Sequence, residues 1–373
     1  MKTIVVLGGA GDMGSRIVRE LIASKEVNVI IADFREDKAK QLLEEFNDKE
    51  RHSTIFVDAN NHHLLKEVIA NGDVVVNAIG PFYRYARKIA SAAIEVGIPY
   101  IDICDDDDAM VEILSLDRYA IRKGVTVITG VGWTPGISNI LAKKGTMLLD
   151  EVHDIDMTWV GGTADSEGVA VISHVLHAIN RDTPMYLDGQ WQNVPALSGV
   201  EEVEFPEPIG KVKAYYVGHP EPITLPQYID GVRNVRLRGY LLPDEMQNIT
   251  KLMIDLDLVN SNQKIQSLSV AIQPLLPMFS MIGKKKTLPL SAIRVDVTGI
   301  KDNSFKHYGW TAIDSMERLT GIPPAVTALM VARGEIKAAG VFPAEGVIEP
   351  DSFIAELAKR DIEIEEIQEG KNG

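Results

Sequence analysis

The chain has 373 residues, of which 45% are hydrophobic and 24% are charged. These proportions are ordinary for a soluble globular protein, and the length predicts two or three domains. The formal net charge is −15 at pH 7. Because such a surface repels nucleic acid and anionic membranes, neither is an expected partner.

The cysteine content and the hydropathy of the chain limit where in the cell it is expected to act. Cys104 is the only cysteine, so no internal disulfide and no cysteine-based zinc site can form, and a reducing, cytoplasmic location is expected. The first strand signal follows Met1-Lys2 directly, so no signal peptide is expected. The most apolar stretch, Ser267 to Lys286, contains two prolines and ends in three lysines, so it falls short of a spanning helix. We interpret it as a subunit-contact or lid element, with a membrane-surface role as the less favoured alternative.

The most informative stretch runs from Thr3 to Asp33. Its apolar, β-branched run Ile4 to Leu7 predicts a buried strand, and GAGDMG, which fits G-x-G-x-x-G, follows. Apolar residues at helical spacing come next, and a second apolar run ends at Asp33. Strand, glycine motif, helix, strand and terminal acid in this order predict dinucleotide binding.

Each part of this stretch has an expected task. Gly9 should allow the tight turn, Gly11 the approach of the backbone to a pyrophosphate, and Gly14 the close packing of helix on strand. The helix N-terminus offers unpaired N–H groups to the phosphates, and the Asp33 carboxylate can accept hydrogen bonds from the adenosine ribose. The predicted phosphate-binding residues are Gly9, Ala10, Gly11, Asp12, Met13 and Gly14.

Strand and helix signals continue to alternate as far as Thr129. Further strands are predicted at 54–57, 73–76, 100–103 and 125–129, with helices at 35–46, 62–70 and 84–96. Six short strands with helices between them predict a Rossmann-type, doubly wound parallel sheet. Ligands of such sheets bind at the carboxyl ends of the strands, so the loops after strands one and four should flank the nicotinamide. The second of these loops contains Ala78, Gly80 and Pro81.

Two acidic features of this region have open interpretations. Asp58 follows the third strand, where it would either contact the adenine end of the cofactor or cap the next helix. The run Asp105 to Asp108 follows the fifth strand. It could accept a cationic substrate amine, but a solvated helix N-terminus stabilised by its dipole is the favoured interpretation.

The pattern of helix, strand and loop signals changes after the glycine-rich turn at 130–136. A helix is predicted at 137–149, followed by strand-like runs at 152–160, 211–217, 232–241 and 292–298 with long loops between them. This pattern predicts an α+β domain with a mostly antiparallel sheet. The tail is expected to be helical at 313–319, 325–334 and 352–359, with turns at 320–324 and 340–343. The expected domains are 1–135, 136–310, and a C-terminal segment 311–373 that returns to the first domain.

The second domain supplies candidates for catalysis. His174 and His177 lie on one face of a predicted helix at 170–179, and an imidazole suits proton transfer near neutral pH. Because neither H-E-x-x-H nor a third ligand accompanies them, no metal site is predicted. His219 and His307 are further candidates. No triad spacing supports a nucleophilic hydrolase.

Two arginines are candidates for substrate binding. Arg236 and Arg238 share one face of a predicted strand with Tyr240. A guanidinium is the natural clamp for a substrate carboxylate. The alternative is that this face of the strand is a solvent-facing stripe.

Five short motifs together resemble the saccharopine dehydrogenase-like oxidoreductases. They are GGAGDMG at 8–14, NAIGPF at 77–82, GWTPGISNILA at 132–142, TGIPPAV at 320–326 and GVFPAEGV at 340–347. The resemblance implies a Rossmann domain with an inserted α+β substrate and dimerisation domain. It also implies NAD(P)-dependent chemistry at a C–N bond of an amino acid or amine, and a homodimer.

The resemblance also implies roles for individual residues. Gly9, Gly11 and Gly14 match the pyrophosphate turn, and Asp33 matches the ribose-binding position in its NAD-type form. Arg35 could tolerate a 2′-phosphate, so the expected cofactor is NAD, with NADP as the alternative. Gly80 and Pro81 match the loop beside the nicotinamide ring, and Pro135-Gly136 matches the turn that opens the substrate domain.

One motif departs from the saccharopine-forming branch. Those reductases typically read D-P-G-I-D-H where this chain reads T-P-G-I-S-N at 134–139. The P-G-x-S-N form is similar to the lysine dehydrogenase branch, so a lysine dehydrogenase-like activity is expected, with a saccharopine dehydrogenase-like one beside it. Two alternatives are a non-catalytic NAD(H) sensor and an NAD-dependent synthase that joins two amines.

Overall fold

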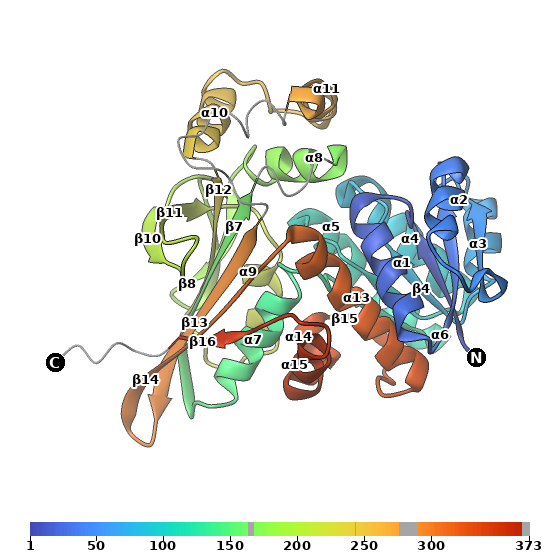
Figure 1. The fold of residues 1–373 in the computed structure, drawn as a ribbon. Coiled ribbons are helices and arrows are strands. Elements are labelled where there is room, and N and C mark those ends of the chain that lie inside the picture. Colours follow the sequence, from blue (N-terminus) through green and yellow to red (C-terminus); the bar gives the residue numbers. More distant parts are fainter. Residues whose placement is uncertain (163–167, 243, 276–289, 368–373) are drawn as a thin grey trace. The chain divides into compact units, whose positions relative to one another are not determined.

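The computed structural model describes residues 1–162, 168–242, 244–275 and 290–367 (Figure 1). The chain divides into two compact units. Unit 1 comprises Met1–Ile137 and Glu317–Glu349, and unit 2 comprises Ser138–Met316 and Pro350–Gly373. Most of the apolar stretch from Ser267 to Lys286 lies outside the described residues, so its interpretation as a lid or subunit contact stays a prediction.

Unit 1 is built on a seven-stranded sheet in the order β15-β6-β5-β4-β1-β2-β3, and every pairing in it is parallel. Its strands are β1 (Thr3–Leu7), β2 (Asn28–Asp33), β3 (His52–Phe56), β4 (Val74–Asn77), β5 (Tyr100–Asp102), β6 (Thr126–Thr129) and β15 (Gly340–Pro343). Its helices are α1 (Asp12–Ser24), α2 (Glu36–Glu44), α3 (His62–Ile69), α4 (Phe82–Val96), α5 (Asp107–Leu114), α6 (Asp117–Lys123), α13 (Met316–Arg333) and α14 (Ala344–Val347). The predicted Rossmann-type sheet is confirmed.

Both faces of this sheet are buried, as a parallel sheet requires. Val5 and Leu7 of β1 belong to an apolar cluster that includes Leu65 of α3 and Ile89 of α4. Ile4 and Val6 alternate with them along the strand, point to the opposite face and are also fully buried. The strand order reverses between β1 and β4, which places the switch point where the first and fourth strands end.

Three predictions for the tail are wrong. Residues 340–343, expected to form a turn, form β15, which pairs in parallel with β6 at the edge of the sheet. The expected break at 320–324 does not occur, because α13 runs unbroken from Met316 to Arg333 with Pro323 and Pro324 inside it. Ile313, expected to be helical, belongs to strand β14.

Unit 2 contains a nine-stranded sheet in the order β10-β11-β12-β7-β13-β14-β16, with β8 paired to β12 and β9 paired to β8. Its strands are β7 (Glu151–Gly162), β8 (Thr183–Leu187), β9 (Gln190–Val194), β10 (Glu201–Glu204), β11 (Lys211–Tyr216), β12 (Asn234–Leu242), β13 (Ser291–Lys301), β14 (Ser304–Asp314) and β16 (Glu365–Glu366). Its helices are α7 (Ile137–Thr146), α8 (Val169–Ala178), α9 (Glu221–Thr224), α10 (Asp244–Asp255), α11 (Asn262–Ile272) and α15 (Pro350–Ala358).

The second sheet is mostly antiparallel, and among the strand pairings of the described residues only that of β12 with β7 is parallel. The final strand β16 pairs with β14, which assigns residues 350–373 to unit 2. The chain therefore returns to unit 1 for 317–349 and then leaves it again, a division that differs from the three segments expected from the sequence. Within the described residues, no helix is long and apolar enough to cross a membrane.

Candidate active site

The turn after β1 brings backbone groups close together. Gly8 has a φ of +73°, so it is a left-handed residue of this turn. A Cβ on Gly9 would lie 2.9 Å from Ile31 Cγ2, and one on Gly14 would lie 2.0 Å from the Gly8 carbonyl oxygen. Gly9 and Gly14 are therefore required for packing, and the predicted role of Gly14 agrees with this contact.

The N-terminus of α1 fits a phosphate. Gly11 is the N-cap residue of α1 and has no side chain to bond the first N–H groups of the helix. A Cβ on Gly11 would lie 3.3 Å from the Gly8 carbonyl oxygen, so a larger residue would crowd the turn. Uncapped N–H groups beside a glycine cradle are the donor set that a dinucleotide pyrophosphate needs, and the residues from Gly9 to Gly14 would hold it. The specific contacts predicted for Ala10, Asp12 and Met13 stay predictions.

Asp33 is tied to the glycine turn. Its Oδ2 accepts a hydrogen bond from the Ala10 N–H at 2.9 Å, and its Oδ1 accepts one from the Arg35 N–H at 2.9 Å. The Arg35 Nε contacts Oδ1 at 3.3 Å, while its Nη2 donates to the Ala10 carbonyl oxygen at 3.1 Å. Asp33 is only 4% exposed, whereas nearly half of the Arg35 side chain faces solvent. The more accessible of the two charges at this position is therefore the positive one.

An aromatic pair adjoins this position. Phe34 follows Asp33 directly and is 65% exposed, which is unusual for a phenylalanine. Its ring lies 5.4 Å from that of Phe56, the last residue of β3. Exposed rings at the carboxyl ends of β2 and β3 offer an apolar surface at the edge where Rossmann sheets bind the adenosine half of a dinucleotide.

The loops after β4 and β5 are fixed by buried polar side chains. A Cβ on Gly8 would lie 3.0 Å from the Ala78 carbonyl oxygen, so the exits of β1 and β4 nearly touch. Asn77 donates to the Tyr100 hydroxyl at 3.0 Å, and that hydroxyl donates to Asp102 Oδ2 at 2.8 Å. The loop that contains Gly80 and Pro81 begins at this network of hydrogen bonds. Its position beside the nicotinamide ring stays a prediction.

Asp102 is the centre of the network. Its Oδ1 accepts hydrogen bonds from the backbone N–H groups of Cys104 and Gly130 and from the Thr129 hydroxyl. Burial is the largest influence on Asp102 and raises the pKa of its carboxyl above the ordinary value, although these donors act in the opposite direction. Asp102 thereby joins the loops that follow β5 and β6.

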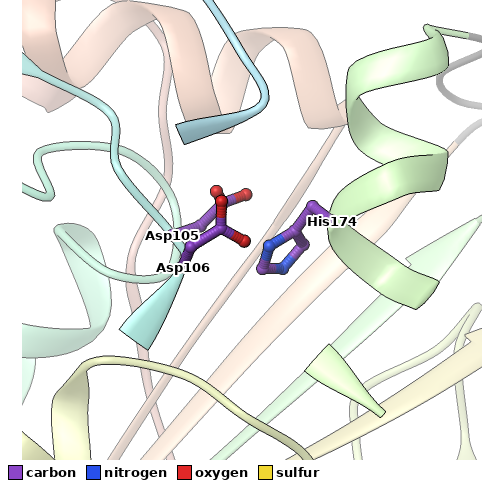
Figure 2. Close-up of side chains that lie close together, drawn as sticks. All are labelled: Asp105, Asp106 and His174. Atoms are coloured by element: carbon purple, nitrogen blue, oxygen red, sulfur yellow. The ribbon is translucent and has the colours of Figure 1, made fainter. Parts of the chain in front are cut away.

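The acidic run after β5 forms a helix N-terminus, as the favoured interpretation predicts, because Asp106 is the N-cap residue of α5 and Asp107 and Asp108 lie in its first turn. The expected solvation of this end is wrong for two of the carboxylates. Asp106 and Asp107 are buried, and Asp106 Oδ2 accepts a hydrogen bond from the Tyr83 N–H at 2.9 Å. Figure 2 shows Asp105 and Asp106 on the segment that leaves the fifth strand. These carboxylates sit at the ligand-binding edge of the sheet.

Asp58 does not cap α3, so that interpretation is also wrong. The N-cap of α3 is Asn61, whose side chain accepts from the Leu64 N–H, while Asp58 accepts two hydrogen bonds from Asn60. The adenine contact predicted for Asp58 stays a prediction.

Unit 2 contains a buried cluster of Ser138, His174, His219 and Glu221, which we call the histidine–glutamate cluster. His174 projects from α8 (Figure 2), and its Nε2 lies 3.2 Å from His219 Nε2. His219 Nδ1 lies 3.3 Å from Glu221 Oε2, and the other carboxylate oxygen accepts from the Ser138 hydroxyl at 2.8 Å. Three titratable side chains are therefore connected in series inside one unit.

The local sequence explains how this cluster is held. Pro220 and Pro222 flank Glu221 and restrict the backbone around it, and Pro220 is the N-cap residue of the short helix α9. Ser138 and Asn139 lie in the first turn of α7, where the Asn139 amide bonds the Thr224 hydroxyl at 3.4 Å. Ser138 and Asn139 stand where saccharopine-forming reductases typically have D-H. In this chain, both side chains thus bind α9.

Comparison with known proteins decides the family. The saccharopine dehydrogenase NADP binding domain matches residues 4–128, and the saccharopine dehydrogenase C-terminal domain matches residues 132–362. The chain belongs to the saccharopine dehydrogenase family. It is an oxidoreductase of this family and uses a nicotinamide cofactor.

Relatives and a solved structure of the family align over nearly all of the chain. The carboxynorspermidine synthase of Vibrio alginolyticus is 24% identical, with 97% of each chain covered. The carboxyaminopropylagmatine dehydrogenase of Synechocystis is 24% identical, with 98% of each covered. The apo saccharopine dehydrogenase (L-Glu forming) of Saccharomyces cerevisiae has the same fold, with a TM-score of 0.71, 16% identity, and coverage of 99% of this chain and 100% of that one.

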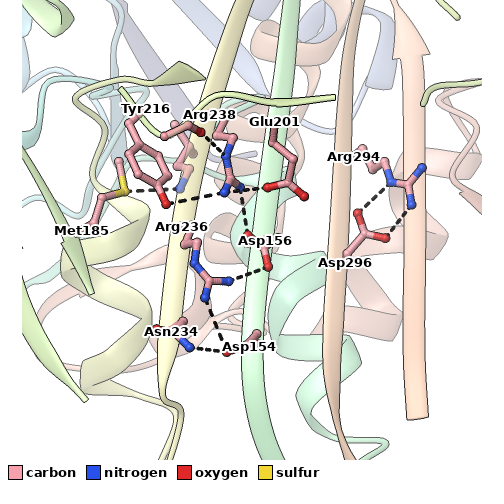
Figure 3. A network of polar contacts seen from close by, with 12 residues as sticks. Asp154, Asp156, Met185, Glu201, Tyr216, Asn234, Arg236, Arg238, Arg294 and Asp296 are labelled. Atoms are coloured by element: carbon pink, nitrogen blue, oxygen red, sulfur yellow. Dashed lines mark hydrogen bonds and ion pairs between the residues drawn. The ribbon is translucent and has the colours of Figure 1, made fainter. Parts of the chain in front are cut away.

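The two arginines predicted as a carboxylate clamp bind carboxylates of unit 2 itself. Arg236 and Arg238 each donate to Asp156 at 2.9 Å, and Arg238 also contacts Glu201 at 2.6 Å (Figure 3). The register of β12 on β7 sets Arg236 opposite Asp156. Both guanidiniums are therefore neutralised within the sheet, and the clamp stays a prediction that this geometry does not support.

His177 and His307 lie outside the histidine–glutamate cluster. His177 is buried on α8 one turn beyond His174. His307 Nε2 lies 2.7 Å from Asp296 Oδ1, and Arg294 bonds both oxygens of the same carboxylate. Burial raises the pKa of Asp296, but the hydrogen bonds from His307 and Arg294 outweigh it and hold that pKa below the ordinary value. A catalytic role for His177 stays a prediction.

Glu221 and Phe34 are the residues that sequence reasoning missed. The signal for Glu221 is a glutamate between two prolines two residues after a histidine, a pattern that marks a rigid turn rather than a catalytic motif. The signal for Phe34 is an aromatic residue directly after the ribose-binding aspartate.

Proposed function

We propose that the chain forms or oxidises the C–N bond of a carboxylated polyamine, with NAD(P) as the hydride carrier. The observation that carries this proposal is the alignment over nearly the whole chain with two relatives whose names specify a carboxylated norspermidine and a carboxyaminopropyl agmatine. A net charge of −15 supports a polycationic substrate, because the field of the protein attracts it. The acidic run from Asp105 to Asp108 adds negative charge at the ligand-binding edge of unit 1.

The chemistry is a balanced hydride and proton transfer. When bound, the nicotinamide accepts a hydride from the carbon next to the substrate nitrogen, or donates one in the reverse direction. The substrate ammonium must lose one proton for this oxidation, so a base of the protein is required. The imine that remains takes up water and separates into an aldehyde and a primary amine. In reverse, an aldehyde and an amine lose water and the imine is reduced.

Arg35 supports NADP as a cofactor beside NAD. Its guanidinium is held against Asp33 and is the accessible charge at the position that binds the adenosine ribose in Rossmann domains. A 2′-phosphate would therefore meet a positive group there. NAD, expected from Asp33 alone, stays the alternative. The homodimer and the cytoplasmic location expected from the sequence also stay predictions.

A substrate panel tests the proposal. The purified protein is incubated with NAD or NADP and carboxynorspermidine, carboxyaminopropylagmatine, norspermidine, saccharopine or lysine, and cofactor reduction is followed by absorbance. We expect many turnovers with a carboxylated polyamine and little reaction with norspermidine, which lacks the carboxyl group. Reaction with lysine alone would instead assign the chain to the lysine dehydrogenase branch. Tight cofactor binding without turnover would favour the sensor, and a product formed without net cofactor reduction would favour the synthase.

A further inference from the structure

A hollow of about 540 Å³ lies in unit 2, between the turn that joins β8 to β9 and the segment that leads into β12. Its volume falls within the range of about 300–1,000 Å³ that small-molecule sites occupy. Every residue that lines it belongs to unit 2. None of these residues is part of the glycine turn, the acidic run or the histidine–glutamate cluster. The hollow is therefore built from residues to which no role has yet been given.

The turn between β8 and β9 forms one wall of this hollow. Asp188 and Gly189 have φ values of +51° and +77°, the backbone that an Asp-Gly pair adopts in a two-residue hairpin turn. Hydrogen bonds tie the turn to the start of β12. The Gly189 N–H donates to the Arg233 carbonyl oxygen at 2.9 Å, and the Asp188 N–H donates to Asn234 Oδ1 at 3.0 Å. The wall is therefore fixed by the backbone before any ligand binds.

Charged residues of both signs line the hollow. Asp188, Asp230 and Arg233 are exposed, whereas Ile229 and Val232, which also line it, are 7% and 4% exposed. In the part of the chain that the structure describes, none of the three charged side chains makes a hydrogen bond or an ion pair. They differ in this from Arg236 and Arg238, which are neutralised within the sheet. The two carboxylates and the guanidinium are therefore available to a ligand.

An aromatic pair adjoins these charges. The partly buried Tyr186 lines the hollow, and its ring meets that of Trp191 edge to face, with 5.1 Å between the ring centres. The Trp191 indole N–H donates to the Pro222 carbonyl oxygen at 3.0 Å. A tyrosine ring beside carboxylates favours an ammonium group, because the face of the ring attracts cations. Trp191 also provides a spectroscopic reporter next to the hollow.

We propose that this hollow binds a small amino acid whose side chain carries a second ammonium group. The Arg233 guanidinium matches the carboxylate of such a ligand, since it can donate two parallel hydrogen bonds. Asp188 and Asp230 match its two ammonium groups. Two carboxylates and one guanidinium leave the hollow with a net negative charge, and the ligand carries a net positive charge. The site is independent of the proposed function, because it needs neither the cofactor nor a reaction.

A water-filled surface hollow is the competing interpretation. Exposed charged side chains are normally solvated, and ion pairs between exposed groups contribute little. A solvated hollow predicts no saturable binding and no dependence on which charges a ligand carries. The proposed site predicts both, so a set of ligands that differ by one charged group separates the two interpretations.

The binding test uses ornithine, putrescine and norvaline as probes. Putrescine is ornithine without the carboxylate, and norvaline is ornithine without the side-chain ammonium group. Each is titrated into the purified full chain without cofactor, while NMR follows the indole N–H of Trp191, assigned through Trp191→Phe. We expect a saturable shift with ornithine and affinities about 5-fold or more lower for the other two, the scale of one exposed ion pair. Ornithine that binds by calorimetry without moving the Trp191 signal, or that binds no better than putrescine, overturns the proposal.

Variants of the hollow identify the charges involved. Arg233→Ala should weaken ornithine by about 5-fold or more and should bring its affinity close to that of putrescine, because the partner of the carboxylate is gone. Asp230→Asn should weaken ornithine and putrescine alike. Lys306→Ala and Asp302→Asn are the matched controls, since they remove the same kinds of charge from exposed residues in and just before β14. These controls should bind ornithine as the wild type does.

Wild-type affinity for ornithine in both Arg233→Ala and Asp230→Asn would remove the site from the hollow. No cofactor and no turnover enter these measurements, so their outcome does not depend on the substrate panel. A chain that binds ornithine in the hollow but oxidises no carboxylated polyamine keeps the site and loses the proposed function. A chain that turns over such a substrate but shows no binding at the hollow keeps the function and loses the site.

Discussion

Gly218 donates its backbone N–H to the Ala178 carbonyl oxygen at 2.8 Å, and this bond joins the loop that carries His219 to the end of the helix that carries His174. A Cβ on Gly218 would lie 3.1 Å from the same oxygen, so only glycine permits the approach without displacement. The two imidazoles are 45 residues apart in sequence, and their Nε2 atoms lie 3.2 Å apart. The bond between Gly218 and Ala178 is one of the constraints on the two segments that carry them.

Gly218→Ala should separate the two histidines without removing either. The added methyl group has to push the loop away from Ala178, which lengthens the hydrogen bond between the Gly218 N–H and the Ala178 carbonyl oxygen. We expect the free energy of unfolding to fall by about 1 kcal/mol, measured by urea denaturation. An unchanged free energy of unfolding would show that the loop accommodates the methyl group without displacement.

Arg238→Ala should act on stability and not on substrate binding. The Arg238 side chain is 7% exposed and binds Asp156, Glu201 and the Gly199 carbonyl oxygen, so its loss leaves several acceptors of the sheet without their donor. We expect a loss of about 2 kcal/mol in the free energy of unfolding, measured by urea denaturation.

The matched control for this change is Arg233→Ala, on the exposed residue just before β12, which should alter stability by no more than about 0.5 kcal/mol. KM for a carboxylated substrate should stay at the wild-type value in Arg238→Ala. A large increase in KM in a stable Arg238→Ala protein would restore the carboxylate clamp.

Local patterns were sufficient to predict unit 1. Its strands are short apolar runs that end in glycine or acidic residues, and the order of these signals specifies the Rossmann sheet. Two errors arose where packing overrides local preference. Pro343 and Gly340 signal a turn, yet an edge strand tolerates them, and β15 lies at an edge. Pro323 should break α13, yet the helix continues through residues that are almost wholly buried, whose packing offsets a proline penalty of about 3 kcal/mol.

The sequence predicted the candidate site only where one continuous segment of the chain supplies all the residues involved. The glycine turn and Asp33 come from a single βαβ unit, so spacing alone locates them. The histidine–glutamate cluster combines α7, α8 and α9, and no periodicity connects Ser138, His174 and Glu221. The sequence of β12 does not reveal that β7 is its partner strand, which brings Asp156 opposite the two arginines. Arg236 and Arg238 were therefore predicted to be available for substrate.

Arg35→Ala should distinguish the two dinucleotides. Its guanidinium is the accessible charge beside Asp33, so its removal should weaken NADP by about 10-fold or more, the scale of one charge-assisted contact, and affect NAD much less. Dissociation constants from isothermal titration of the purified protein measure both. Asp33→Ala is the companion variant and should weaken NAD more than NADP if the carboxylate binds the ribose. Equal effects of Arg35→Ala on the two cofactors would remove Arg35 from the 2′-phosphate site.

His52→Gln should reduce the pH dependence of stability below neutral pH. Burial, and then the charge of Arg51, lower the pKa of His52 below its ordinary value of 6.5, although Asp48 acts in the opposite direction. The neutral ring accepts the Val29 N–H through Nδ1, a bond that protonation removes. Because the unfolded chain takes up this proton more readily, the contribution of His52 is complete above pH 6.5 and is lost as the pH falls through the lower, folded pKa. The difference in unfolding free energy between wild type and His52→Gln, from urea denaturation at several pH values, should therefore shrink as the solution is acidified.

His63→Gln, which changes a side chain that is 83% exposed, is the control and should give a nearly constant difference in unfolding free energy. A constant difference for His52→Gln would mean that His52 titrates alike in the folded and unfolded chain.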